Sequence, residues 1–453
     1  MSASSKLPGP RGPGVRRLRR MRRDPLEFFL ELPARYGPLV RVRFGPVRLI
    51  SVTDPALVTR VLVDDADGYK KGMALERARA ILGDGLLTSD GDLHRRQLRL
   101  IGPALSRRRV AGYERTICAI VEDCDADWRD GASIDICVEM SRLTLGIVVA
   151  TLFGGQLESG DADRVSAGLA GVMEHFEWLV THPLGTLRLR VPTPRVRRLL
   201  AARAELRAVV DRLVAKPLAP DAGTPDLLAD LIAAREDCGG MGNELLRNEV
   251  LTLLLAGHET TANWLTFTWL ALAEHPDVAI RLRQELDEKL GDRPATLADR
   301  DRLPLTHAVL QETLRLFPPA WGVGRRARAD RELGGHTVPA GTVVSACQYV
   351  VHRDPALWDA PERFDPDRWL DGRAAGIPRG GFFPFSDGPR RCIGEHFARA
   401  EAVLILATLA RRWEFHRLAD EPVGLDPKVT LRPRGPQIMR TVRVDPHVWD
   451  DAR

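Results

Sequence analysis

The stretch FSDGPRRCIG, residues 385–394, sets one cysteine, Cys392, between two glycines just before a predicted helix. Gly388 can adopt the positive φ that a tight loop needs, and Gly394 has no side chain to block a flat ligand. Unpaired N–H groups and the helix dipole favour a thiolate at such a position, and Phe385 can shield the sulfur from water. The loop therefore predicts a metal-thiolate site; the alternative is an inert buried cysteine.

As a pattern, F-x-x-G-x-R-x-C-x-G resembles the heme-binding loop of the cytochrome P-450 superfamily, and this chain matches it at every defined position. The resemblance implies a mainly α fold with a small β portion, in which Cys392 is the axial ligand of the heme iron. It also makes Arg390 a candidate for a heme propionate. The stretch VHRDPALWDAPERFDPDRW, residues 351–369, is similar to soluble bacterial members that tailor natural products.

A second motif, LLLAGHETTANW at residues 253–264, places an acid and hydroxyls inside an apolar helix. Gly257 weakens the helix locally, and a threonine hydroxyl can divert a backbone carbonyl and bend the turn. The resemblance implies a groove for dioxygen beside Ala256 and Gly257. In that groove Thr260 orients water and Glu259 relays protons. The alternative is a solvated polar patch.

A third motif, QETLRLFPP, places Glu312 and Arg315 at i and i+3 on one helix face. The later stretch APERFDPDRW adds Arg363 as a plausible third member of a buried ionic network. The resemblance assigns these three residues to a structural triad behind the heme. Removing one partner from a buried network costs about 3–5 kcal/mol. Taken alone, the i, i+3 pair is also compatible with a surface salt bridge.

Further candidates for the heme propionates come from a helix and a strand. His94 fits the first contact of the family helix, but the arginine that the family places four residues later is Leu98 here. Arg99 comes one position further and points in a different direction on a helix. Arg325 matches the family's strand arginine, and Arg326 is expected to face the opposite side.

Periodicity predicts the other elements. The longest helix is expected from Asn243 to Glu274 and would span roughly 45 Å. The remaining expectations are a hairpin at 39–52, a helix capped by Asp54, helices across 92–316, strands at 334–346, an irregular segment at 352–385, a helix after Cys392 and terminal strands. We expect a Pro/Gly/Arg-rich segment at residues 1–24 and a single heme-thiolate domain at residues 25–453.

Composition limits the class of protein. The chain has 453 residues, 44% hydrophobic and 28% charged, which is typical of a soluble globular protein. Its net charge of +5 comes without a basic stripe interleaved with aromatics, so nucleic acid is not an expected partner. No uncharged stretch reaches the roughly 20 residues of a membrane span. The arginine run from Arg16 to Arg23 could contact anionic lipid, although a solvated segment is the simpler interpretation.

Six cysteines without a C-x-x-C pair or a secretory signal predict reduced thiols in the cytoplasm of a bacterium. We expect a monomer. The resemblance implies heme b, dioxygen as co-substrate, and electrons from NAD(P)H through a ferredoxin, or a flavodoxin, with its reductase. A basic docking surface is expected on the thiolate side, formed by Arg96, Arg107, Arg108, Arg109 and Arg391.

The implied reaction inserts one oxygen atom of dioxygen into a C–H bond, or a C=C bond, of a lipophilic small molecule. The substrate is expected to be a terpenoid, a polyketide or a fatty-acid-like metabolite, with a preference for a terpenoid. Candidate pocket residues are Ala320, Trp321 and Val323, together with residues 68–90 and 165–195. The alternatives are a heme-thiolate isomerase or dehydratase, a peroxygenase, and a heme sensor. A requirement for dioxygen and an electron donor separates the first reaction from all of these.

Overall fold

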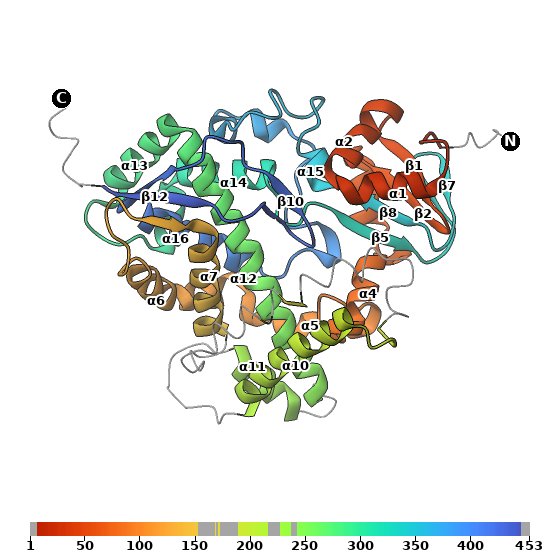
Figure 1. Ribbon diagram of the computed structural model, residues 1–453, viewed down its shortest axis with the longest axis horizontal. Coiled ribbons are helices and arrows are strands. Elements are labelled where there is room, and N and C mark those ends of the chain that lie inside the picture. The colour runs from red at the N-terminus through yellow and green to blue at the C-terminus, as the bar shows by residue number, and fades with distance from the viewer. Residues whose placement is uncertain are drawn as a thin grey trace.

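A 32-residue helix, α12 (Asn243–Glu274), runs through the centre of the computed structural model (Figure 1). The structure describes residues 7–152, 168, 171–172, 189–215, 227–236 and 242–444. Helix α12 begins and ends at the residues that periodicity predicts. It is apolar over most of its surface because other elements cover it on several sides, above all α7 (Ile136–Leu152).

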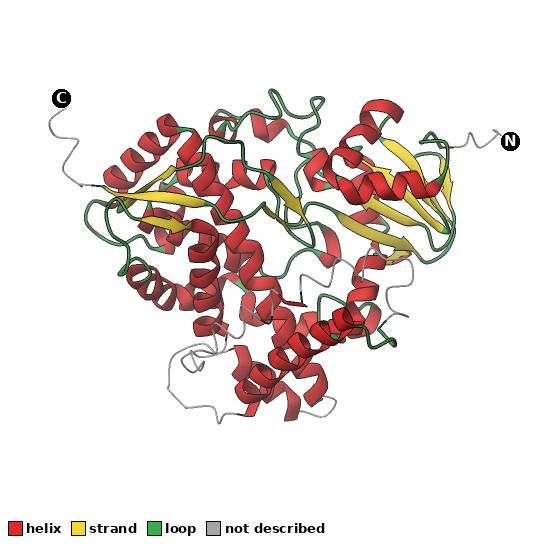
Figure 2. Cartoon of the chain, viewed as in Figure 1, coloured by secondary structure: helices red, strands yellow, loops and turns green. Residues whose placement is uncertain are grey.

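Helices make up most of the remaining structure, and Figure 2 shows most of them in the part of the molecule away from the N-terminus, while α1 (Gly14–Arg23) and α2 (Pro25–Tyr36) lie beside the large sheet at the N-terminal end. The others are α3 (Pro55–Thr59), α4 (Met73–Leu82), α5 (Gly91–Ile101), α6 (Arg107–Asp123), α10 (Pro194–Ala215), α11 (Leu227–Glu236), α13 (Pro276–Leu290), α14 (Pro304–Leu316), α15 (Gln348–Val351) and α16 (Glu395–Leu409). The mainly helical fold class that the sequence predicts is confirmed.

The largest sheet lies at the N-terminal end of the molecule (Figures 1 and 2). Its strand order is β1 (Leu39–Phe44), β2 (Val47–Val52), β8 (Val343–Ala346), β5 (Val323–Ala327), β3 (Tyr69–Lys71). Strands β2 and β8 run parallel, and the other pairs are antiparallel. The smaller sheets are β4 (Ser133–Asp135), β12 (Ile438–Arg443) and β9 (Trp413–Arg417); β10 (Leu425–Pro427) and β11 (Leu431–Pro433); β6 (Arg331–Leu333) and β7 (His336–Val338).

Local predictions hold where turn and cap chemistry is explicit. The β1–β2 hairpin turns at Gly45, whose φ is 60°. Asp54 caps α3 by accepting the N–H of Leu57 at 2.9 Å. The irregular segment at 352–385 is anchored from within, because Nε2 of the buried His352 accepts the N–H of Phe383 at 3.0 Å.

The expected domain boundary at residue 24 stays a prediction. Residues on its N-terminal side nevertheless pack on the strand that follows, since the N–H of Arg41 donates to Pro8 O at 2.8 Å. The Arg17 guanidinium also donates to the carbonyl of Arg43. In the described ranges, no helix combines the length and apolar character that crossing a bilayer requires.

Candidate active site

The cysteine loop, residues 385–394, is held in a tight conformation by backbone contacts. The N–H of Cys392 donates to Phe385 O at 2.9 Å. Gly388 has a φ of 72°, and a Cβ there would lie 2.1 Å from Leu62 O, so only glycine fits. The loop ends at Gly394, which precedes the first residue of α16. The backbone therefore fixes the position from which the Cys392 side chain leaves the loop.

The Cys392 thiol lies in a recess. The residue is exposed, yet burial among the surrounding atoms raises the pKa of its thiol, an effect that the backbone N–H of Gly394 opposes. The two observations agree if protein encloses the sulfur on most sides and leaves one side open. A Cβ at Gly394 would lie 4.0 Å from the sulfur, so this glycine keeps one approach clear.

Phe385 connects the cysteine loop to α12. Its ring lies 6.1 Å from that of Trp264, edge to face, and the Arg399 guanidinium stands 4.8 Å from its centroid. Trp264 follows Thr260 by four residues, so the two share a face of α12. The helix face that carries the predicted oxygen-groove threonine thus continues directly onto the cysteine loop.

The threonine hydroxyls in the polar turn of α12 bond backbone carbonyls one turn earlier, while the helix stays continuous. The hydroxyl of Thr260 donates to Ala256 O at 2.8 Å, and that of Thr261 donates to Gly257 O at 3.2 Å. Ala256 is exposed although Leu255 beside it is 7% exposed. Open space therefore lies next to Ala256 and the Thr260 hydroxyl, where the sequence places the groove.

Glu259 is held by a residue that the sequence did not single out. Its Oε1 accepts the hydroxyl of Thr430 at 2.6 Å, and Nδ2 of Asn263 donates to the same hydroxyl oxygen at 3.3 Å. Burial raises the pKa of Glu259, and the Thr430 bond and the charge of Arg432 oppose that rise. Glu259 can therefore carry a proton nearer neutral pH than an exposed glutamate.

A cluster of cations gathers between β3, β5, α5 and the cysteine loop. His94 and Arg325 are both buried, and Nζ of Lys71 lies 3.3 Å from Nδ1 of His94. Arg325 Nη2 donates weakly to Ser386 Oγ at 3.4 Å, which links β5 to the cysteine loop. Arg390 donates to Asp90 at 2.9 Å, as well as to two backbone carbonyls.

Among the described residues, the cations of this cluster outnumber the carboxylates beside them. Burial, and after it Arg325 and Arg390, lower the pKa of Lys71 to about 7 against the opposing effect of Asp90. Burial and then Arg390 lower the pKa of Arg325 to about 10, and burial and then Lys71 lower that of His94 to about 4. Asp90 pairs with Arg390 and is shared with Arg328 at 3.3 Å, and the buried Glu249 also acts on Lys71 by raising its pKa.

Two atoms of the cluster also lack a hydrogen bond within the described part of the chain. They are Nε2 of His94 and Nε of Arg390, and both are buried. Buried cations in excess, together with unpaired donors, form a site for an anionic ligand. Carboxylates of a flat cofactor bound at Cys392 would supply the missing charge.

Lys71, and not Arg99, is the basic side chain that the structure places beside His94. Arg99 is exposed, whereas Lys71 is 7% exposed and reaches His94 from β3. Arg326, the residue after Arg325 in β5, faces the opposite side of the sheet from Arg325, as predicted, and donates to Glu76 at 2.8 Å. Strand alternation in the YKK stretch could have indicated Lys71, but a lysine in so short a strand carries little signal alone.

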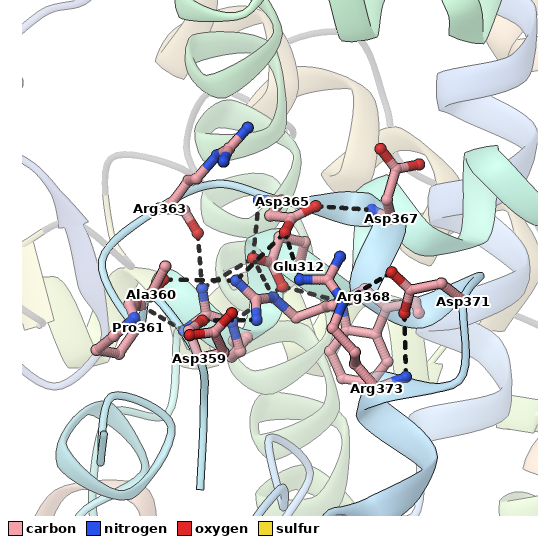
Figure 3. Close-up of polar contacts among 12 residues, drawn as sticks. Glu312, Asp359, Ala360, Pro361, Arg363, Asp365, Asp367, Arg368, Asp371 and Arg373 are labelled. Carbon is pink, nitrogen blue, oxygen red and sulfur yellow. Dashed lines mark hydrogen bonds and ion pairs between the residues drawn. The ribbon is translucent and has the colours of Figure 1, made fainter. Parts of the chain in front are cut away.

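The ionic network is present, but one of its three predicted members is wrong. Glu312 and Arg315 are both 0% exposed and form an ion pair at 2.8 Å. The third side chain is that of Arg368, whose Nε donates to Glu312 at 3.0 Å. Figure 3 shows the Arg363 side chain pointing away from Glu312. Arg363 is exposed and contributes only its carbonyl, which accepts Arg315 Nη2 at 3.0 Å.

The predicted pocket residues lie at the start of β5. Trp321 is partly buried, its indole N–H donates to Lys428 O at 3.0 Å, and its ring lies 6.2 Å from that of Phe29. Ala320 is exposed and Val323 is partly buried. Of the two longer stretches predicted for the pocket, residues 68–90 are described, whereas most of 165–195 lies outside the described residues.

One buried acid near the site had no signal in the sequence. Glu401, in α16, is 0% exposed, and neither carboxyl oxygen forms a hydrogen bond within the described ranges. Burial raises its pKa well above the ordinary value, and nearby Thr261 offsets this only in part. Glu401 therefore holds a proton to higher pH than an exposed glutamate, and it lies on a helix that packs against α12.

Comparison with known proteins agrees with this geometry. The family model of cytochrome P-450 matches residues 9–440. The chain belongs to the cytochrome P-450 family. This cytochrome P-450 is 39% identical over 417 residues to cyclooctatin synthase of Streptomyces melanosporofaciens, and the matched region covers 91% of this chain and 90% of that protein. It is 38% identical over 394 residues to cyclooctat-9-en-7-ol 5-monooxygenase of the same organism, with 86% and 85% covered.

A solved structure has the same architecture. The crystal structure of the cytochrome P450DA heme domain superposes with a TM-score of 0.87 at 27% identity, covering 98% of this chain and 99% of that one. As a member of the family, this cytochrome P-450 is a monooxygenase that uses heme, dioxygen and external electron donors.

The residues present fit heme. Cys392 offers a recessed thiol with one open side, and beside His94 the cations Lys71, Arg325 and Arg390 outnumber the carboxylates that the described residues place around them. Two propionate carboxylates would balance these cations through charge-assisted hydrogen bonds.

Lys71 therefore gives a test of heme retention. Lys71→Met is expected to release heme to an acceptor globin about tenfold faster or more, because a hydrogen bond to a charged group contributes about 1.5–3 kcal/mol. Lys70→Met is the matched control, since Lys70 forms an ion pair with Glu76 at 2.6 Å instead. Equal release rates for the two variants would exclude Lys71 from the heme contacts.

Proposed function

We propose that this cytochrome P-450 uses heme b, held by Cys392, to oxygenate a C–H or C=C bond of a lipophilic terpenoid. The observation that carries the proposal is the arrangement on α12. Thr260 stands beside exposed Ala256, and the same helix face continues through Trp264 to the cysteine loop. Two relatives named for cyclooctatin chemistry, one a monooxygenase, support a terpenoid substrate.

Bound heme supplies the reductive activation of dioxygen. The chain's own side chains orient water and deliver protons in the groove. The Thr260 hydroxyl, donating to Ala256 O at 2.8 Å, is fixed where it can orient water in the groove. Glu259, whose pKa burial raises, can hold a proton to higher pH than an exposed glutamate and pass it inward, while Thr430 fixes its carboxyl orientation. The apolar residues around α12 keep other water away.

A ferredoxin with its reductase is the proposed donor chain, supplied by NAD(P)H. Support comes from the surface at the head of α16, which packs on α6. Arg107, Arg108 and Arg391 are exposed there. Burial lowers the pKa of His396, and so do Arg107, Arg391 and Arg300, while Glu395, which pairs with Arg391, opposes the shift; three cations and one acid therefore lie near His396. An acidic protein fits such a surface. Arg96 and Arg109, which are partly buried, stay predictions as members of this surface.

The proposal extends to the state of the protein in the cell. The described cysteines, Cys118, Cys124, Cys137, Cys347 and Cys392, are free thiols, which supports a reducing, cytoplasmic setting. We propose a monomer.

Thr260→Ala tests the oxygen-activating role. We expect NAD(P)H consumption to continue while product falls by about tenfold or more, because a positioned proton-transfer group contributes about 10²–10⁴-fold. Thr260→Ser keeps the hydroxyl and should retain most of the coupling. The assay supplies a ferredoxin, its reductase and terpenoid hydrocarbons, and it measures product, peroxide and label from ¹⁸O₂. Full coupling in Thr260→Ala would remove the assigned role, and product formation without dioxygen would contradict the monooxygenase reaction on terpenoids.

The pH dependence tests Glu259. The pKa of Glu259 is raised in the folded protein, so turnover that needs its proton should persist above the ordinary glutamate pKa and fall as pH rises through the raised value. Thr430 stabilises the carboxylate, so Thr430→Val should raise this pKa further. The alkaline limb of the rate profile should then move to higher pH. An unchanged limb would show that Glu259 does not limit proton delivery.

A further inference from the structure

Positive charge is concentrated near the N-terminus. Residues 7–50 contain eleven arginines against three acidic residues, a net charge of +8, whereas the whole chain carries +5. The rest of the chain is therefore slightly acidic. The electron-donor surface at α6 and α16 does not account for this charge, because Figure 1 places α1 and β1 at the opposite end of the molecule.

The structure brings these arginines to the surface of adjoining segments. Helix α1 starts against the β1–β2 turn, since a Cβ at Gly14 would lie 2.8 Å from Gly45 N. Arg17 anchors the helix to Arg43 O at 2.8 Å, and Arg20 pairs with Glu31. We define the arginine face as the exposed residues Arg11, Arg16, Arg19, Arg23, Arg41, Arg43 and Arg48.

No described carboxylate compensates the charge of the arginine face. In the part of the chain that the structure describes, none of its seven members forms an ion pair with a carboxylate. Arg43 lies directly opposite Arg48 across the β1–β2 ladder, a like-charge arrangement that destabilises a sheet. Asp24 is occupied in capping α2 by accepting the N–H of Glu27 at 3.0 Å. Such a surface is suited to an external polyanion.

Neighbouring side chains favour lipid over other polyanions. Val15, in α1, is 64% exposed, and Leu18 lies three residues later on the same face of that helix. The aromatic residues nearby do not offer free rings for stacking on bases, because Phe28 and Phe29 are buried and Phe44 is partly buried. Arginines interleaved with an exposed aliphatic side chain fit phosphate headgroups above an acyl layer.

We propose that the arginine face docks this protein peripherally on a membrane surface rich in anionic phospholipid. Each arginine near such a surface raises affinity about fivefold. A protein held there would meet a lipophilic substrate where that substrate concentrates. The docking itself requires no turnover, so it can be tested whether or not the proposed reaction is correct.

The experiment is co-sedimentation of the heme-loaded full chain with vesicles. We expect binding to phosphatidylcholine vesicles that contain phosphatidylglycerol, loss of that binding at high salt, and none to pure phosphatidylcholine. The variant R16Q/R19Q/R23Q should bind about 100-fold more weakly. Its absorption spectrum should match the wild type, which shows that it is folded.

The matched control is R129Q/R197Q/R198Q, which removes the same charge from exposed arginines elsewhere. It should keep wild-type vesicle binding. Equal weakening in both variants would mean that net charge alone drives the binding, and would overturn the docking face. So would absence of wild-type binding to the phosphatidylglycerol vesicles. Tighter binding to a short DNA duplex or to polyglutamate, lost in the same arginine variant, would assign the face to another polyanion.

Discussion

Arg368→Ala is expected to destabilise the folded protein by about 3 kcal/mol, near the lower end of the range for breaking a buried ion pair. Arg368 is 1% exposed, and its guanidinium bonds Glu312 at 3.0 Å and Asp359 O at 2.9 Å. Removing it leaves both acceptors without that donor in a buried site. The loss of stability is expected to stay near the lower end of that range because Arg315 still pairs with Glu312.

Arg363→Ala is the matched control, five residues earlier in the same stretch. Its side chain is exposed and points away from Glu312 (Figure 3), so the free energy of unfolding should change by about 0.5 kcal/mol at most. Urea unfolding followed by fluorescence and by heme absorbance measures both variants. The assignment would be wrong if Arg363→Ala were the more damaging change.

The sequence could not distinguish these two arginines. Both occur in APERFDPDRW, and both are compatible with a third member of the network. The backbone decides between them. Ala360 takes a φ of 43°, and the 3₁₀ turn Pro366–Trp369 then directs Arg368 inward. No periodic pattern predicts a positive φ at an alanine, so the sequence could not predict the direction that the chain takes after Ala360.

Other parts were predictable because their signals are local. The bounds of α12 follow from a long apolar helix pattern ended by Pro276, and the glycines of the cysteine loop are needed by its geometry. The heme-propionate cluster was only partly predictable. Lys71 joins His94 and Arg325 through the pairing of β3 with β5, a contact between segments about 250 residues apart. The Glu259–Thr430 bond is non-local in the same way.

Cys392→Ala is expected to have the largest effect on function. The variant should lose the long-wavelength Soret band that thiolate-ligated heme gives with carbon monoxide after dithionite reduction, and monooxygenase activity should disappear with it. The physical reason is that Cys392 supplies the one thiol of this loop, while Gly388 and Gly394 shape the backbone around it.

Cys137→Ala is the control for this change. Cys137 is a free thiol at the start of α7, where burial raises its pKa to about 12, so it should remain protonated and its loss should leave the spectrum unchanged. A long-wavelength band that survives in Cys392→Ala would assign the ligand to another cysteine. A short-wavelength band in the wild type would mean that Cys392 binds as a neutral thiol. In that case the electron donation that favours O–O cleavage would be missing. The roles proposed for Glu259 and Thr260 in oxygen activation would then no longer apply.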